Sequence, residues 1–265
     1  MTVQRPAAVA GRFYPRRPEV LRDTVTAMLD AVEVPDDDVP ARGYVVPHAG
    51  YRFSGPVAAQ VYARIRRHRD RIDRIVLVGP SHFVPLTGAA ASGYPSWATP
   101  LGPVDTAAPE GIRTDEAAHE QEHSLEVQLP FLQCALGEQA RFTVVPVVIG
   151  RCTVTEARDT IDSMMDDSTL LLCSTDLSHY HDEPTAIRLD RATADAVLAG
   201  DPQRIGVTDA CGVFALRGTV AWAARHGLST SLLRLGTSAD TYGGSDRVVG
   251  YPAFAFGTGS DSGHS

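Results

Sequence analysis

Histidines follow three apolar runs of the kind that form buried strands. They are His48 after residues 44–46, His82 after residues 75–78 and His179 after residues 170–172. Neutral imidazole is a common protein ligand for metal ions near neutral pH. A single loop histidine is more often a hydrogen-bonded structural residue, but the repeated placement favours a shared metal site.

The position of these histidines in a sheet decides whether they can meet. The carboxyl ends of parallel strands share one edge of a sheet, and ligands bind in the crevice outside that edge. We therefore expect His48 and His82 to lie in one site. His68, His226 and His264 do not follow strands in this way, and we interpret them as surface residues.

A second chemically dense segment, 120–126, opens an expected helix and contains Glu122, His123 and Glu126. Glu122 and Glu126 are four residues apart and would share one helix face. Together with His123 they could act as acid/base groups. Acidic residues also suit the first turn of a helix for electrostatic reasons alone, so a structural interpretation stays open.

Cys211 precedes another expected helix, 212–225. A helix N-terminus lowers a thiol pKa, and a thiolate can be a nucleophile or a soft metal ligand. The alternative is a buried, inert cysteine. The four cysteines form no CxxC pair, which excludes a zinc ribbon, and we expect reduced thiols.

Alternating helices and strands must position these residues. The apolar spacing predicts helices at 18–32, 55–67, 124–136, 153–165, 184–199 and 212–225. It predicts strands at 44–46, 75–78, 142–149, 170–172, 232–235 and 248–256, with Pro146 suggesting an edge or a bulge. This order predicts one α/β domain over residues 1–257, with a mainly parallel or mixed central sheet flanked by helices, and a flexible tail at 258–265.

Composition excludes several functional classes. The formal net charge of -8 argues against a nucleic-acid partner. No apolar run approaches the roughly 20 residues that cross a membrane, and the first residues do not form a signal peptide. We expect a cytoplasmic protein without a membrane partner. The GxGxxG, P-loop, HExxH and GxSxG motifs are absent, which argues against the enzymes that use them.

Five motifs in order resemble the Memo family. They are PHAGYRFSG (47–55), GPSH (79–82), EHSLEVQLPFLQ (122–133), STDLSHY (174–180) and ACGVFAL (210–216), preceded by AGRFYP (10–15). The resemblance spans almost the whole chain. It implies a fold like that of the class III extradiol dioxygenases, which are non-haem iron enzymes.

The resemblance also implies a set of site residues. The metal ligands would be His48, His82 and Cys211, the catalytic residues His179, Asp176 and His123, and the substrate-binding residues Tyr51, Ser54 and Glu122. Iron or copper is the expected cofactor, with zinc as an alternative. Relatives are associated with AMMECR1-like and radical-SAM proteins and, in animals, with phosphotyrosine peptides.

Three functions remain open on this basis. The first is a metal-dependent redox enzyme acting on a small molecule, in which Asp176 orients His179 as acid/base. The second is a non-catalytic module that binds a peptide or protein in the same cleft, although the loops are poor in arginine apart from Arg52. The third is a metal-independent hydrolase or transferase with Cys211 as nucleophile. Because a cysteine replaces the carboxylate of the dioxygenase site, ring cleavage is not implied.

Overall fold

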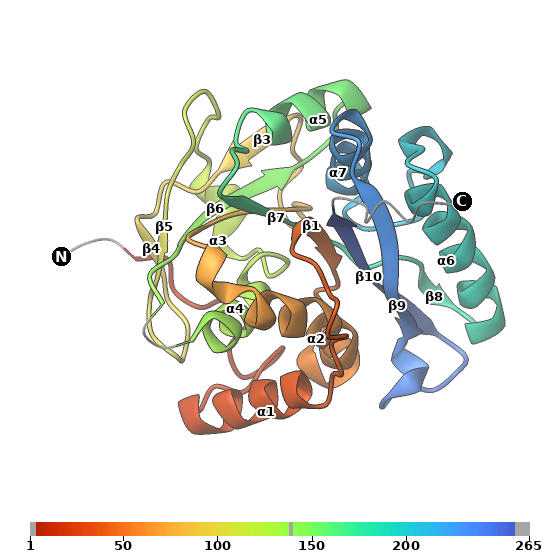
Figure 1. Cartoon of the computed structure of the whole chain (residues 1–265), viewed down its shortest axis with the longest axis horizontal. Coiled ribbons are helices and arrows are strands. Elements are labelled where there is room, and N and C mark those ends of the chain that lie inside the picture. Colours follow the sequence, from red (N-terminus) through yellow and green to blue (C-terminus); the bar gives the residue numbers. More distant parts are fainter. Residues whose placement is uncertain (1–3, 138–139, 258–265) are drawn as a thin grey trace.

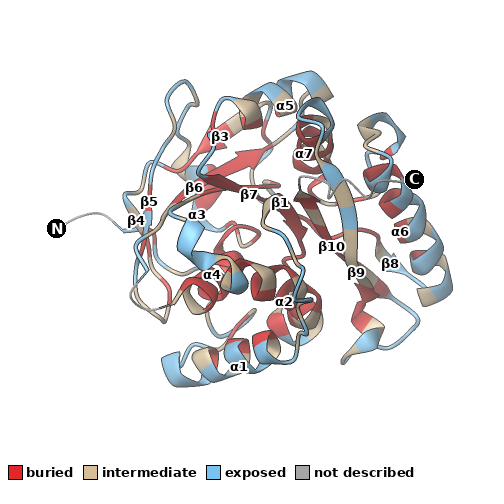
Figure 2. Ribbon diagram, viewed as in Figure 1, coloured by how far each residue is buried: buried red, intermediate tan, exposed pale blue. Residues whose placement is uncertain are grey.

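Four apolar strands pair in parallel at the centre of the protein, in a computed structural model that describes residues 4–137 and 140–257. They are β1 (Ala41–Val46), β2 (Arg74–Gly79), β6 (Thr143–Ile149) and β7 (Thr169–Ser174). β2 pairs with both β6 and β7, and β1 pairs with β7. All of β7 is buried, as Figure 2 shows, which is typical of parallel strands covered on both faces.

Further strands extend this centre on both sides. They are β3 (Ala89–Ala91), β4 (Ser96–Trp97), β5 (Val104–Thr106), β8 (His179–His181), β9 (Ser229–Thr237) and β10 (Val248–Gly257). Some are short, and the long strands β9 and β10 pair antiparallel with each other. The order is β4-β5-β6-β2-β7-β1-β10-β8, with β3 beside β6 and β9 beside β10. β10 runs antiparallel to β1, so the sheet is mixed (Figure 1). The predicted α/β fold class is confirmed.

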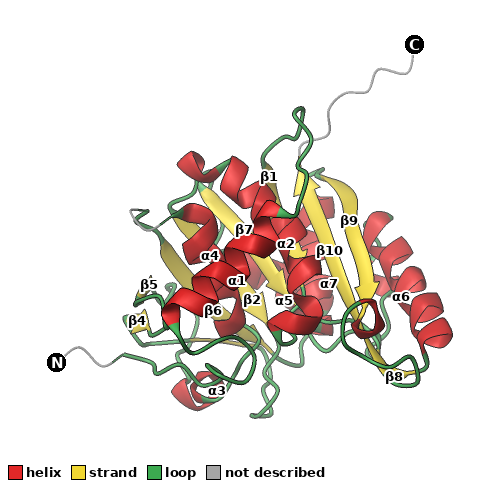
Figure 3. Cartoon of the chain, turned by 90° about the horizontal axis from the view of Figure 1, so that it is seen from below, coloured by secondary structure: helices red, strands yellow, loops and turns green. Residues whose placement is uncertain are grey.

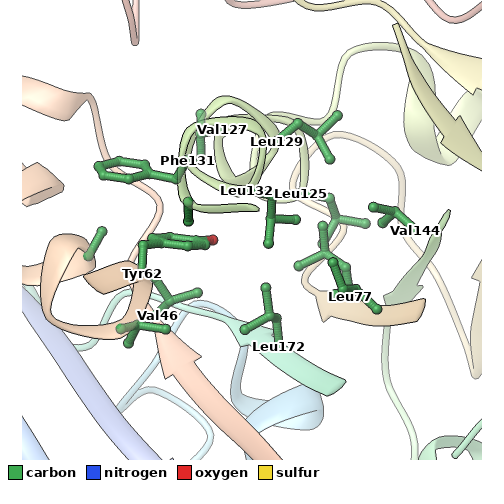
Figure 4. Packing of buried hydrophobic residues seen from close by; sticks show 14 of the residues in the cluster. Val46, Tyr62, Leu77, Leu125, Val127, Leu129, Phe131, Leu132, Val144 and Leu172 are labelled. Atoms are coloured by element: carbon green, nitrogen blue, oxygen red, sulfur yellow. The ribbon is translucent and has the colours of Figure 1, made fainter. Parts of the chain in front are cut away.

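Helices cover both faces of the sheet (Figure 3). α1 (Pro18–Asp30), α2 (Tyr51–Arg67) and α4 (Leu129–Leu136) pack on one face, and α5 (Val154–Asp162), α6 (Glu183–Leu198) and α7 (Val213–Arg225) on the other. Alternate strand residues supply the two cores: Val46, Leu77 and Leu172 face α4, as Figure 4 shows, and Val45, Val76 and Leu171 face the opposite way. A short helix, α3 (Glu116–Glu120), precedes the segment with Glu122 and His123.

Two predicted helices begin elsewhere. α2 starts at Tyr51 instead of residue 55, with Gly50 as its N-cap, and Pro56 lies inside the helix. The predicted helix 124–136 divides into a 3-10 turn at Glu126–Gln128 and α4, with Pro130 in the first turn of α4. A proline fits that position because the first turn needs no hydrogen bond from its nitrogen.

Pro146 lies inside the sheet, not in an edge strand. β6 pairs with β5 at residues 143–144 and with β3 at residues 147–149. Pro146 falls between these two short partners, and β2 continues unbroken on the other side. The proline is tolerated because the hydrogen-bond ladder on one side of β6 is interrupted at this residue, so that β6 locally resembles an edge strand.

The limits of the domain stay a prediction, and the tail predicted at 258–265 lies outside the described residues. Within the described ranges, no helix combines the length and apolar character needed to cross a bilayer.

Candidate metal centre

His48, His82 and His123 converge at the carboxyl edge of the parallel strands. Their ring centroids lie 5.2 Å (His48–His82), 5.5 Å (His48–His123) and 4.7 Å (His82–His123) apart. One nitrogen from each ring falls within 4.8 Å of the other two. The expectation that the loops after β1 and β2 meet is therefore correct, and the structure adds His123 from the loop before α4.

Hydrogen bonds fix the tautomer of His48. The Ser174 hydroxyl donates to the Ser124 carbonyl at 2.7 Å and accepts from Gln128 Nε2 at 2.8 Å. Because its one proton is used, it must accept from His48 Nδ1, 3.0 Å away. The proton of His48 is thus on Nδ1, and Nε2 presents a lone pair.

Glu122 orients the other two rings. Its Oε1 accepts from His82 Nδ1 at 2.9 Å, which leaves Nε2 of His82 available. The same oxygen lies 3.5 Å from Nδ1 of His123 and accepts from the His123 and Ser124 amides at 2.9 and 2.8 Å. These contacts and His82 hold the pKa of the buried Glu122 at about 2 despite its burial. A carboxylate behind ligand histidines is a common way to fix their orientation.

The local chain geometry lets these loops approach one another. Gly79, at the end of β2, has no room for a side chain, because a Cβ there would meet Leu125 at 2.8 Å. It would also lie 3.2 Å from the Ser174 carbonyl oxygen, so a larger residue would require the Leu125 side chain to move and would crowd β7. This close approach explains the glycine that begins the GPSH motif.

A buried ion pair anchors the segment from the other side. Arg5 Nη1 lies 2.6 Å from Glu126 Oε2, and both side chains are completely buried. Arg5 also donates to the carbonyls of His119 and Glu122, at 2.8 and 2.6 Å. Glu126 accepts from Tyr14 as well, at 2.6 Å. Glu126 is therefore a structural residue. The acid/base interpretation of segment 120–126 does not apply to it.

Burial favours the neutral form of His48 and His123. Burial, reinforced by His82 and His123, lowers the pKa of His48 well below its usual value. Burial lowers the pKa of His123 to about 4. Uncharged imidazoles are the form that binds metal ions, and a site with three histidine ligands leaves coordination positions open, as in catalytic sites.

Cys211 lies at the edge of this group. Its Sγ is 3.3 Å from His48 Nε2, and it accepts from the Asp176 amide at 3.3 Å. The expectation of a lowered thiol pKa is wrong: burial, and then Asp176, raise the pKa of Cys211 well above its usual value. This desolvation outweighs the effect of the nearby N-terminus of α7, although Cys211 as a whole is half-buried. Its role as a metal ligand stays a prediction.

Asp176 and His179 lie close by but do not form the expected pair. Asp176 Oδ1 accepts from the amide of His48 at 2.8 Å, and burial raises the pKa of Asp176 to about 7. His179 Nδ1 donates to the Leu177 carbonyl at 2.8 Å. A backbone carbonyl, and not Asp176, therefore sets the tautomer of His179.

These groups line one cavity of about 770 Å³, which we call the histidine cavity. His48, His82, His123, Asp176, His179 and Cys211 all contribute to its wall. Among the described residues, Phe13, Phe53 and Tyr251 supply apolar surface to the same wall. The volume suits a small organic ligand.

The three predicted substrate-binding residues are not part of this wall. Tyr51 is buried and donates to the Val127 carbonyl at 2.5 Å. Ser54 is buried and donates to the Ala49 carbonyl at 2.9 Å. Glu122 lies behind the rings that it orients. Their substrate-binding role stays a prediction, and their observed contacts are structural.

Two of the histidines interpreted as surface residues, His68 and His226, are not part of the cavity wall. His226 is exposed and pairs with Asp162 at 2.6 Å. His68 is half-buried and pairs with Asp38 at 3.0 Å, while His264 lies outside the described residues. Sequence analysis missed His123 as a ligand candidate because it follows no strand. The signal that could have indicated a ligand is the acid beside it, Glu122, because ligand histidines often have a carboxylate partner.

Comparison with known proteins gives consistent matches over nearly the whole chain. The family model for the Memo-like protein matches residues 5–255. A MEMO1 family protein of Methanopyrus kandleri is 35% identical, over 97% of this chain and 100% of its own. One from Methanococcoides burtonii is 35% identical, over 94% of this chain and 98% of its own. One from Thermoplasma acidophilum is 35% identical, over 94% and 97%.

Proposed function

The chain belongs to the Memo-like protein family, and we propose that it is a metal-dependent redox enzyme acting on a small organic molecule. The observation that carries the proposal is the convergence of His48, His82 and His123 on the wall of one cavity. Each of these rings can present a nitrogen lone pair there. A site of three histidine ligands with open coordination positions is typical of catalytic rather than structural metal sites.

The donor set fits iron or copper, with zinc as the alternative. Imidazole suits all three ions, and a bound ion would supply Lewis acidity and, if iron or copper, electron transfer. Cys211 Sγ, beside His48 Nε2, is a candidate fourth donor. A sulfur donor would favour copper over iron.

The chain's own residues would handle the protons. The Nε2 of His179 bears a lone pair, because Nδ1 donates to Leu177, so this ring can accept a proton from a ligand in the cavity. Asp176 has a pKa of about 7, so its carboxyl group can hold a proton near neutral pH. Phe13, Phe53 and Tyr251 would exclude water from a bound ligand.

Oxygen consumption tests this proposal. Metal-free protein would be loaded anaerobically with Fe(II), Cu(II) or Zn(II) and screened in an oxygen electrode against a library of small aromatic and aliphatic compounds. We expect uptake with iron or copper, none with zinc, loss in His123→Ala and retention in the surface control His226→Ala. Equal uptake by His123→Ala, or none with any ion and compound, would contradict the proposal.

A second function, a peptide- or protein-binding module, is favoured by one observation. Tyr180 and Tyr242, at the wall of the histidine cavity, are 64% and 78% exposed, and Phe83 beside His82 is 54% exposed. Exposed aromatic side chains of this kind mark binding surfaces. An AMMECR1-like or radical-SAM protein is the candidate partner. A pull-down with wild type and Tyr242→Ser tests this, and equal retention of partners by both would contradict it.

The third function, a thiol-dependent hydrolase or transferase, is the least supported. A nucleophilic cysteine needs a thiolate, and the raised pKa of Cys211 disfavours that form. Alkylation of Cys211 at neutral pH as slow as that of the buried Cys173 would exclude it.

A further inference from the structure

A second cavity adjoins the histidine cavity. It has a volume of about 920 Å³ and lies against the start of α2 and the segment 11–15. The two cavities share four wall residues, Phe13, Gly50, Phe53 and Tyr242. A ligand at the histidines could therefore extend past these residues into the second cavity, which we call the arginine cavity.

Arginines without carboxylate partners border this connected space. Arg12 and Arg52 line the arginine cavity, and Arg247 lines the histidine cavity. None of the three forms an ion pair with any residue in the described ranges. Arg64 and Arg66, farther along α2, illustrate the contrast, since each pairs with an aspartate.

The charge of this region opposes that of the whole protein. The chain carries a formal net charge of -8, yet the walls of the two cavities contain three arginines and a single carboxyl group, Asp176. That carboxyl is buried and accepts a hydrogen bond from the His48 amide at 2.8 Å. A region rich in unpaired guanidinium groups attracts anions.

The passage between the cavities is aromatic. The Phe13 ring packs on His123 with centroids 4.6 Å apart, and the Arg52 guanidinium lies 4.4 Å from the centre of the Phe53 ring. An anion bound by Arg52 would thus be separated from the histidines by apolar ring surface. A ligand that reaches both ends must have an apolar body between its two ends.

We propose that Arg12 and Arg52 form an anion subsite, and that the substrate is a small organic anion whose carboxylate or phosphate group binds there while its apolar body reaches the histidines. The inference rests on the proposed function for the reacting end of the substrate. Arginine suits the anionic end, because its fork of N–H groups can bind a carboxylate or phosphate with two parallel hydrogen bonds. Arg247 then faces the reacting end of the substrate.

Chain-length series of organic anions test the subsite. The probes are ω-phenylalkanoic acids from phenylacetic to 6-phenylhexanoic acid, the matching phenylalkyl phosphates and the neutral primary amides of the acids. Binding would be measured by isothermal titration calorimetry on metal-free and on Zn(II)-loaded protein. We expect the acids or phosphates of one chain length to bind about tenfold or more tightly than the amide, as charged hydrogen bonds allow. Equal affinity of anions and amides at every length would overturn the subsite.

Variants locate the anion. Arg12→Gln and Arg52→Gln should each weaken anion binding about tenfold without changing amide binding, and Arg52→Lys should restore part of it. Arg188→Gln removes an exposed arginine of α6 that lines neither cavity, and it should have no effect. Unchanged anion affinity in the Arg12→Gln/Arg52→Gln double variant would overturn the assignment.

The binding measurements on metal-free protein distinguish a failure of this inference from a failure of the proposed function. If the protein binds no metal but still prefers anions through Arg12 and Arg52, the proposed function fails and the subsite stands. If metal binds with unchanged affinity in Arg52→Gln and no anion preference exists, the subsite fails and the metal centre stands.

Discussion

Glu122 holds His82 through two hydrogen bonds, accepting from its amide at Oε2 (2.6 Å) and from its Nδ1 at Oε1 (2.9 Å). One carboxylate thus fixes both the backbone and the ring of a candidate metal ligand. It does so without contributing to the cavity wall. This arrangement makes Glu122 a positioning residue, so a substitution of Glu122 should change the affinity of the protein for metal ions.

Glu122→Gln should weaken metal binding by about 10–100-fold, because an amide cannot accept from all the donors that surround this carboxylate. The measurement is a Zn(II) titration of metal-free protein with a competing chelator. Glu120→Gln changes an exposed acid two residues away and serves as the matched control. An affinity within twofold of wild type for Glu122→Gln would contradict the positioning role.

Glu126→Gln should lower the free energy of unfolding by about 3–5 kcal/mol, because it leaves the completely buried Arg5 without its countercharge. Urea unfolding of the metal-free protein measures the change. Glu110→Gln, at an exposed position, should change stability by less than about 0.5 kcal/mol. A loss below about 1 kcal/mol for Glu126→Gln would mean that the pair does not anchor the segment.

In the metal-free protein, the contribution of His123 to stability should fall as the pH falls from 6.5 to about 4. His123 has a folded-state pKa of about 4, so the unfolded chain takes up its proton first over this interval. In His123→Gln, the change in the free energy of unfolding between pH 6.5 and about 4 should differ from that of wild type by up to about 3 kcal/mol, since each pKa unit corresponds to 1.36 kcal/mol. Urea unfolding at several pH values tests this, with His226→Gln as control. A His123→Gln profile parallel to that of wild type would be inconsistent with a neutral, buried ring.

The contribution of Asp176 to stability should change with pH in the opposite direction to that of His123, and Asp176→Asn should remove it. The folded-state pKa of Asp176 is about 7, above its usual value of 3.8, so wild type loses this contribution to stability as the pH rises from 3.8 to about 7. The stability of Asp176→Asn relative to wild type should therefore increase by up to about 4 kcal/mol between pH 4 and pH 8. A difference that stays constant or falls over this range would show that the carboxyl is ionised throughout.

The sequence predicted the parts of the site that depend on local pattern. Continuous apolar runs identified β1, β2 and β7, and their parallel pairing brings the loops with His48 and His82 to one edge. The short strands β3, β4 and β5 could not be predicted, because two or three residues carry no periodicity and their pairing with β6 or with one another is decided by tertiary contacts.

The part that could not be predicted depends on burial and on distant partners. His123 joins the other histidines because Arg5, near the start of the chain, fixes the segment through Glu126. Nothing in the local sequence indicates that pairing. The pKa of Cys211 was predicted in the wrong direction because its desolvation follows from packing against Asp176 and His48. Arg12 and Arg247 enter the cavity walls from segments far from the histidine loops.

The number of metal ions bound per chain is the decisive measurement for the three-histidine centre. Metal-free protein would be titrated with Zn(II) and with Fe(II) under anaerobic conditions, and bound metal measured by elemental analysis after gel filtration. We predict one ion per chain in wild type and in Cys211→Ser, and an affinity at least about 100-fold weaker in His48→Ala, His82→Ala and His123→Ala. Binding of no ion by wild type, or of one ion with unchanged affinity by His123→Ala, would contradict the account.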